Sequence, residues 1–192
     1  MDACICRMAK EEDREALLSL WQICFTEDTP ADIRAFLSLT DITQQACCAF
    51  VGDTLVSMLF LLPAVAVHEQ TEYPVHYLYA GCTHPSHRGR RYYGFLLNFA
   101  VQQTQKQQNH AIYLHPAEDK LFDYYAGFGY RRGIQPLPLV LPKNAVVLGP
   151  QEPFFSYFGV GIEGECMWIP VTETALTKAM GHCPAFASRL GN

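Results

Sequence analysis

Three arginines lie close together in the segment THPSHRGRRYYG, residues 83–94. Arg88, Arg90 and Arg91 come just before GFLLNFAVQQTQKQQ (94–108), whose apolar spacing predicts a helix. The start of a helix carries the positive end of its dipole and free backbone N–H groups, so it favours anions over cations. Arginines at such a place indicate either a solvated basic turn or a site for a strongly negative ligand.

The segment before the arginines, VHYLYAGCT (75–83), has the composition of a β-strand. A strand, a short turn and a helix beginning near Gly89 would point several backbone N–H groups at one place beside three guanidinium groups. Helix amides and side-chain charge together form a site for a phosphate or pyrophosphate. The sequence therefore predicts a phosphate-binding turn at the centre of the fold.

The remaining elements must position this turn. We expect strands over 3–8 and 110–115, helices over 11–25, 29–39 and 118–127, and a hairpin over 46–62 that turns at Gly52-Asp53. Thr29 is a good N-cap and Asp32 a candidate for a capping box. In the helix after the turn, we expect Leu96, Leu97, Ala100 and Val101 to face inward. This order of elements predicts a mixed α/β sheet.

The last third of the chain differs from the rest in composition. A proline-rich stretch (133–144) precedes a predicted hairpin (154–171), and Thr172 caps a predicted helix that ends at Gly181. The aromatic segment 153–160 is either a buried strand or the lining of an acceptor pocket. We interpret 1–192 as a single domain, with a core over 1–132 and closing strands plus a small helical extension over 133–192.

Composition excludes several classes of protein. The 192 residues are 49% apolar and 17% charged, which is typical of a globular chain. The longest apolar run, 55–67, is too short for a bilayer span and contains Pro63. No secretory signal is evident at the amino terminus, so we expect a cytoplasmic protein. The net charge of −5 argues against nucleic-acid binding.

Eight cysteines are spread along the chain without a CxxC pair. We expect them to be buried reduced thiols, and we expect no metal site.

Four segments, in the right order, resemble the GCN5-related N-acetyltransferases (GNAT). The stretch T-x-P-x-x-R-G-x before an apolar helix resembles their coenzyme A-binding segment, whose motif is Q/R-x-x-G-x-G/A. Arg88 matches its first position, whereas Arg91 and Tyr93 stand where small residues are usual. The other segments resemble the opening strand and helix (6–25), the second and third strands (50–63), and the Y-x-x-x-G-F loop (121–132). The resemblance covers roughly residues 4–132.

This resemblance implies a mostly antiparallel, twisted sheet flanked by helices, and direct transfer of an acyl group from a coenzyme A thioester to an amine. Tyr125 matches the family's general acid, which protonates the leaving thiolate; Tyr124 is the alternative if the register is off by one. His84 and His115 are candidate bases, with Glu72, Glu118 and Asp119 as further possibilities. In direct transfer the amine itself attacks the thioester and the enzyme supplies no nucleophile, so we reject a covalent role for Cys82.

Acetyl-CoA is the cofactor that the resemblance implies. The family's pantetheine arm runs along the end of the strand before the turn, and its pyrophosphate meets the turn itself. The expected contacts are Gly81, Cys82, Thr83, Arg88, Gly89, Arg90, Arg91, Tyr92, Tyr93 and Gly94.

The acceptor is then an amine of a small molecule or peptide, and a homodimer is possible. The departures at Arg91 and Tyr93 keep a second hypothesis open, in which the chain binds coenzyme A without transfer and acts as a sensor or interaction module. A third hypothesis, nucleic-acid binding by the arginine turn, is disfavoured by the acidic net charge.

Overall fold

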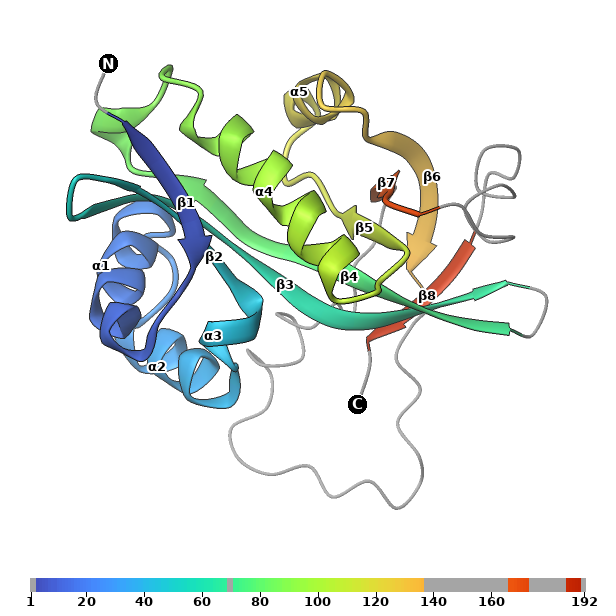
Figure 1. Ribbon diagram of the computed structural model, residues 1–192, viewed down its shortest axis with the longest axis horizontal. Helices are drawn as coiled ribbons and strands as arrows, with labels where there is room; N and C mark the ends of the chain where they lie inside the picture. Colours follow the sequence, from blue (N-terminus) through green and yellow to red (C-terminus); the bar gives the residue numbers. More distant parts are fainter. Residues whose placement is uncertain (1–2, 69–70, 137–165, 173–185, 191–192) are drawn as a thin grey trace. The chain divides into compact units, whose positions relative to one another are not determined.

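The computed structural model describes residues 3–68, 71–136, 166–172 and 186–190. The β-strands in these residues form one sheet. The strands are β1 (Cys4–Met8), β2 (Ala46–Val51), β3 (Thr54–His68), β4 (Thr71–Thr83), β5 (Ala111–Leu114), β6 (Arg131–Pro136), β7 (Cys166–Pro170) and β8 (Phe186–Leu190). Their order is β1-β2-β3-β4-β5-β7-β6-β8, with an additional β3–β8 pairing (Figure 1).

Most of the strand pairs are antiparallel. This holds for β1–β2, β2–β3, β3–β8, β5–β7 and β6–β7, whereas β4–β5 and β6–β8 are parallel. The mixed, mostly antiparallel sheet predicted from the sequence is therefore confirmed. The helical elements are η1 (Glu11–Asp13), α1 (Arg14–Cys24), α2 (Pro30–Leu39), α3 (Ile42–Gln45), η2 (Pro85–His87), α4 (Tyr92–Lys106) and α5 (Lys120–Ala126). None of the described helices is long and apolar enough to cross a bilayer.

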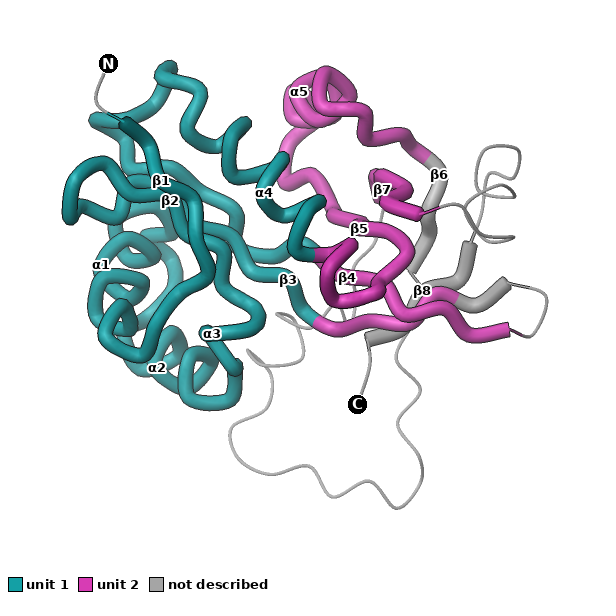
Figure 2. The backbone as a smooth tube through the Cα atoms, viewed as in Figure 1, with its two compact units in different colours: residues 1–62, 78–103 teal, residues 63–77, 104–192 magenta. Residues whose placement is uncertain are grey.

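The chain divides into two compact units (Figure 2). Unit 1 comprises residues 1–62 and 78–103, and unit 2 comprises residues 63–77 and 104–192. Strands β3 and β4 each contribute one part to either unit. The β3–β8 register lies within unit 2, as does that of β4–β5, whereas the β1–β2 and β2–β3 registers lie within unit 1.

An aromatic cluster forms the core of unit 1. The ring of Trp21, from α1, lies 5.1 Å from Phe36 of α2, 5.5 Å from Phe60 of β3 and 5.9 Å from Tyr79 of β4, measured between centroids. Trp21 is 1% exposed. Burial of this much aromatic surface, with tilted ring contacts, ties both helices to the strands that lead to the arginine turn.

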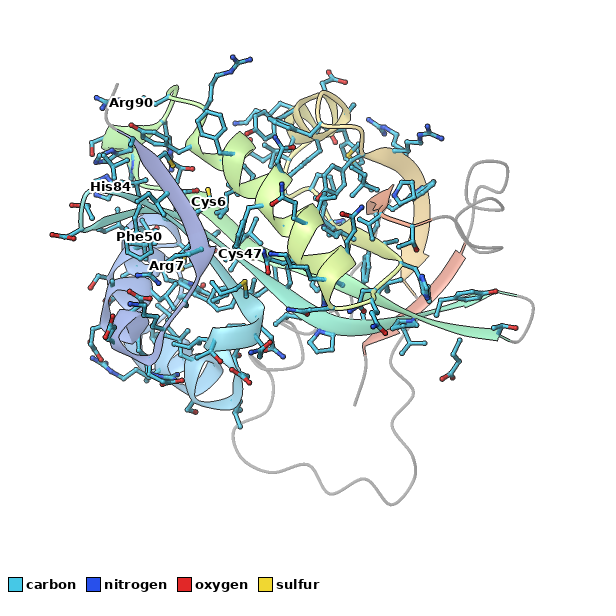
Figure 3. The ribbon with its side chains drawn as sticks, viewed as in Figure 1. Cys6, Arg7, Cys47, Phe50, His84 and Arg90 are labelled. Atoms are coloured by element: carbon cyan, nitrogen blue, oxygen red, sulfur yellow. The ribbon has the colours of Figure 1, made fainter. Side chains whose placement is uncertain are left out.

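A partly buried ion pair fixes the entry into the first helices. Arg7 donates two hydrogen bonds to the Asp13 carboxylate, at 2.6 and 2.9 Å, and its guanidinium lies 4.1 Å above the ring of Phe50 (Figure 3). The Lys10 backbone N–H also donates to Asp13. The hydrogen bond from Arg7 holds the pKa of Asp13 below its ordinary value, so the carboxylate stays charged although it is buried.

Local signals in the sequence located the early elements well. Thr29 caps α2 by accepting a hydrogen bond from Asp32 N–H (3.2 Å), as predicted, and the hairpin turns at Gly52-Asp53. The Asp32 carboxylate accepts a hydrogen bond from the Thr29 hydroxyl (2.6 Å), whereas in the expected capping box it would accept one from the Thr29 backbone N–H. The predicted hairpin over 154–171 and the helix over 172–181 lie largely outside the described residues, as does the segment 153–160.

Two predictions about α4 were wrong. The helix begins at Tyr92, three residues after Gly89, because Gly89 and Arg91 have positive φ angles that a right-handed helix does not accommodate. Leu96, Leu97 and Ala100 are buried as expected, whereas Val101 is only half-buried.

His76, in the β4 part of unit 2, is a buried histidine with a structural contact. Its Nδ1 lies 2.9 Å from the Thr104 hydroxyl, and the side chain is 2% exposed. Burial lowers the pKa of His76 from 6.5 to about 4. The folded protein therefore keeps a neutral imidazole at pH values where the unfolded chain takes up a proton.

Acidification is expected to destabilise the protein through His76. The pKa is lower in the folded state, so the full contribution is present above pH 6.5 and is lost as the pH falls towards 4. Between pH 7 and 4.5 the free energy of unfolding should fall by about 2 kcal/mol more in the wild type than in His76→Gln. Urea denaturation at both pH values measures this difference. Equal losses in the two proteins would show that His76 does not titrate in this window.

Candidate functional site

The end of β4 leads into the arginine turn through an unusual backbone conformation. Ala80 has a φ angle of +47°, which is rare for a residue with a side chain. Such a residue interrupts the regular alternation of a strand and redirects the residues that follow. The strand end is then held by β3, since Ser57 donates to the Cys82 carbonyl (2.7 Å) and His84 N–H donates to the Val56 carbonyl (2.9 Å).

The turn itself has the geometry of an anion site. Gly89 and Arg91 have φ angles of +75° and +65°, and Arg90 between them does not have a positive φ. This alternation directs successive N–H groups towards one side. The first intrahelical hydrogen bond of α4 runs from Phe95 N–H to the Arg91 carbonyl (3.1 Å), so the N–H groups of residues 92–94 precede the ladder of the helix.

Arg91, which stands where the motif has a small residue, has a left-handed φ angle of +65°. A left-handed conformation costs a residue with a side chain roughly 1 kcal/mol, whereas glycine adopts it freely. Arg91 has this conformation despite its side chain, and its exposed guanidinium lies at the turn.

All three arginine side chains of the turn are exposed. Arg88 is partly fixed, because its Nε donates to the carbonyl oxygen of Thr83 at 3.2 Å. Figure 3 shows Arg90 and His84 in this region of unit 1. The predicted cofactor-binding residues are thus brought together: 81–83 end β4, 88–91 form the turn, and 92–94 begin α4. The side chain of Tyr92 is buried, which leaves its backbone as the group available to a ligand.

The histidines of the turn are engaged with each other and with the backbone. His84 accepts a hydrogen bond from Ser86 N–H at Nδ1 (3.2 Å), and the Ser86 hydroxyl lies 2.7 Å from the same nitrogen. His87 packs against His84 with ring centroids 5.6 Å apart, and its buried Nδ1 has no hydrogen-bond partner in the described structure. His84 Nδ1 is therefore already used as a hydrogen-bond acceptor within the turn, which argues against its proposed role as a base.

Tyr125 lies in unit 2, on the short helix α5. It is 7% exposed, and its ring contacts Tyr124 (centroids 5.5 Å apart) and Tyr130 (5.6 Å). Tyr124 is 40% exposed, so the two tyrosines differ clearly in environment. Tyr130 has a buried hydroxyl without a hydrogen-bond partner in the described structure, and burial raises its pKa.

The other candidate bases also lie in unit 2. His115 directly follows β5 and is half-buried, whereas Glu72, Glu118 and Asp119 are exposed. Glu118 forms an ion pair with Lys120. No group of three or more potential metal ligands occurs among the residues described.

The sequence model of the Acetyltransferase (GNAT) domain matches residues 6–133, about two thirds of the chain. The chain belongs to the GNAT family. The matched range nearly coincides with the segment 4–132 in which the four motifs were found, so the resemblance seen in the sequence is confirmed. No curated protein is detectably similar to this GNAT chain in sequence.

Solved structures share the GNAT fold at low sequence identity. A GCN5-related N-acetyltransferase from Anabaena variabilis has a TM-score of 0.61 at 18% identity, covering 68% of this chain and 32% of that one. A conserved protein from Enterococcus faecalis, a probable N-acyltransferase, has a TM-score of 0.60 at 16% identity, covering 68% and 33%. A GNAT acetyltransferase from Brucella melitensis in complex with acetyl-CoA has 0.55 at 13%, covering 68% and 84%. This chain therefore spans about a third of the first two proteins.

The expectation of uniformly buried cysteines was wrong. Cys47, Cys48 and Cys166 are buried, but Cys4, Cys6, Cys24 and Cys82 are partly exposed. Cys24, at the end of α1, was not among the predicted site residues, yet its thiol donates to the Thr83 carbonyl (3.6 Å) at the end of β4. A contact between residues 59 positions apart has no local signal in the sequence.

Gly81 is in close contact with Tyr93. A Cβ atom at residue 81 would lie 2.0 Å from the Tyr93 hydroxyl oxygen and 2.9 Å from Cζ, so the ring would have to move. We expect Gly81→Ala to lower the free energy of unfolding by about 1–2 kcal/mol, as overpacking does. In the background of Tyr93→Ala, the same change should cost almost nothing. Urea denaturation of the four proteins measures the coupling; equal costs in both backgrounds would contradict the contact.

Proposed function

We propose that this GNAT protein transfers an acetyl group from acetyl-CoA directly to an amine of a small molecule or peptide. The observation that carries the proposal is the turn between β4 and α4. There, two left-handed residues, the first N–H groups of α4 and three exposed arginines come together within eight residues. A pyrophosphate with a further phosphate group is a ligand whose charge matches this concentration of donors.

The roles of Arg88, the turn and residues 81–83 are supported by the family motif and the geometry of unit 1, whereas Tyr125, in unit 2, is assigned from its place in the motif alone. The pyrophosphate contacts Arg88 and the N–H groups of the turn, and the pantetheine arm contacts the backbone of residues 81–83. An N–H group of the strand end stabilises the oxyanion of the tetrahedral intermediate. Tyr125 then donates its proton to the leaving thiolate, since a phenol and a thiol have similar acidity. The acceptor amine is deprotonated by a histidine such as His115 or by water.

Thermal unfolding with acetyl-CoA tests the proposal. At a concentration about 100 times its Kd, the cofactor should add roughly 2.7 kcal/mol to the free energy of unfolding and so raise the Tm. Free coenzyme A should stabilise the protein as well, and ATP at the same concentration should do so less. A Tm unchanged at saturating acetyl-CoA would remove the basis of the proposal. An assay for thiol release with a panel of amines then identifies the acceptor.

A second function is favoured by the contact between Tyr93 and Gly81. The tyrosine ring lies against the strand end along which the pantetheine arm is proposed to run. If the ring blocks the reactive end of the cofactor, the protein binds coenzyme A as a sensor or interaction module without transferring the acetyl group. Stabilisation by acetyl-CoA without thiol release for any amine, together with release on Tyr93→Ala, would distinguish this function from catalysis.

A further inference from the structure

The aromatic cluster in the core of unit 1 has a partly exposed rim. The rings of Trp21, Phe36 and Phe60 are buried and form its base. Phe25, directly after α1, and Tyr79, on β4, are half-buried, and their ring centroids lie 6.0 and 5.9 Å from that of Trp21. Partly exposed aromatic rings beside a buried apolar base offer a ligand an apolar contact surface.

A carboxylate is held against the same cluster. Asp28 Oδ2 accepts a hydrogen bond from the indole Nε1–H of Trp21 at 2.7 Å, and the Asp28 backbone N–H donates to the Phe25 carbonyl at 3.4 Å. Asp28 is half-buried, and a carboxylate has about four positions at which it can accept a hydrogen bond. An ammonium group is attracted both by a carboxylate and by the faces of aromatic rings. The combination of groups therefore fits an ammonium ion that carries an apolar substituent.

The rim of the cluster adjoins the strand end along which the pantetheine arm is proposed to run. Tyr79 is separated from the segment 81–83 by one residue. On the other side of the rim, the thiol of Cys24, the neighbour of Phe25, donates to the Thr83 carbonyl at 3.6 Å. A nitrogen that attacks a thioester must approach the carbonyl carbon to about 3–3.5 Å, so the acceptor has to bind beside this strand end.

We propose that Phe25, Asp28 and Tyr79 form the acceptor subsite, and that the acceptor is an arylalkylamine, which binds as its ammonium ion. The ammonium group contacts the Asp28 carboxylate and the ring faces, and the aryl group covers the rim. The inference rests on the proposed function, because the proposed path of the cofactor is what makes this cluster the place for the acceptor. The net charge of −5 favours the approach of a cation.

Binding of a simple arylalkylamine is the direct test. Phenethylamine is a cation at pH 7, and phenethyl alcohol has the same ring and chain without the charge. Isothermal titration calorimetry measures the affinity of the wild-type protein for each compound, with and without free coenzyme A. We expect the amine to bind at least about tenfold more tightly than the alcohol, as a hydrogen bond between charged groups does. Equal affinities, or no binding of the amine in either condition, would overturn the proposal.

Asp28→Asn separates recognition of the ligand from a structural role. The amide oxygen can still accept from Trp21 Nε1–H, so the Tm should not change, whereas the affinity for phenethylamine should fall by about tenfold or more. Glu27→Gln is the matched control, since it removes one charge from an exposed neighbouring residue, and its affinity should stay within about twofold. Phe25→Leu should weaken binding by about threefold through loss of the ring face. Equal losses in Asp28→Asn and Glu27→Gln, or no loss in Asp28→Asn, would contradict the subsite.

Thiol release from acetyl-CoA distinguishes failure of the subsite from failure of the transferase. With phenethylamine as the acceptor, Asp28→Asn should raise KM for the amine by about tenfold and change kcat by less than about threefold, because the charge contributes to binding. Acetyl transfer to other amines that does not respond to Asp28→Asn, without transfer to phenethylamine, would leave the transferase intact and overturn the subsite. Binding of phenethylamine that depends on Asp28, without thiol release for any amine, would support the subsite and remove the transferase.

Discussion

Replacement of Tyr125 by phenylalanine is expected to lower kcat for acetyl transfer at least about 100-fold, with a change in KM for acetyl-CoA of less than about twofold. The variant keeps the ring that packs against Tyr124 and Tyr130, so the fold and the binding of the cofactor are retained. Only the proton that the leaving thiolate would receive is removed. Release of free thiol from acetyl-CoA, followed with a chromogenic reagent, measures both constants.

Tyr124→Phe is the matched control for this prediction. Both substitutions delete one hydroxyl group on adjacent residues of α5, but Tyr124 is 40% exposed and Tyr125 is 7% exposed. We expect Tyr124→Phe to transfer acetyl groups at close to the wild-type rate. Full activity in Tyr125→Phe, with a loss in Tyr124→Phe, would transfer the acid role to Tyr124. Full activity in both would exclude a tyrosine of this helix as the acid.

Arg88→Ala is expected to weaken the binding of acetyl-CoA by about 10- to 100-fold. A hydrogen bond between charged groups contributes about 1.5–3 kcal/mol, which corresponds to this range of affinity. Arg88 is the arginine of the turn that the structure holds in place, through its contact with Thr83, so little ordering is needed when a phosphate binds. Isothermal titration calorimetry of free coenzyme A and acetyl-CoA gives the affinities directly.

Arg34→Ala controls for the loss of one positive charge. Arg34 is an exposed arginine on α2, in the same unit but on a different element. We expect its replacement to leave the affinity unchanged within about twofold, because exposed charges at a distance are screened by salt. Equal effects of the two substitutions would mean that net charge, rather than a contact at the turn, determines the binding of the cofactor.

The location of the cofactor turn was readable from the sequence because its signals are local. An apolar strand, an arginine-containing turn and an apolar helix follow one another within 34 residues, and each of these patterns depends on neighbouring positions. The cap at Thr29 and the turn at Gly52 were predicted for the same reason. The assignment of Tyr125 rests on its place in the Y-x-x-x-G-F motif and stays a prediction.

Tertiary structure decided the features that depend on residues far apart in the chain. The left-handed backbone at Ala80 and Arg91 could not be inferred from residue type, because both residues ordinarily avoid it. The contact between Tyr93 and Gly81 and the hydrogen bond from the Cys24 thiol to the Thr83 carbonyl arise from packing. Periodic patterns of residue types do not indicate contacts between separate elements.

By itself, then, the sequence determined the kinds of elements, the family and the place of the arginine turn, since helix caps, turn glycines and hydrophobic periodicity act over a few residues. The fold alone determined which side chains meet at the end of β4. There it brings the thiol of Cys24 and the guanidinium of Arg88 to one carbonyl oxygen, that of Thr83. The acidity of a thiol depends on the charges and hydrogen bonds around it, and these are fixed only once the helix and strand have packed.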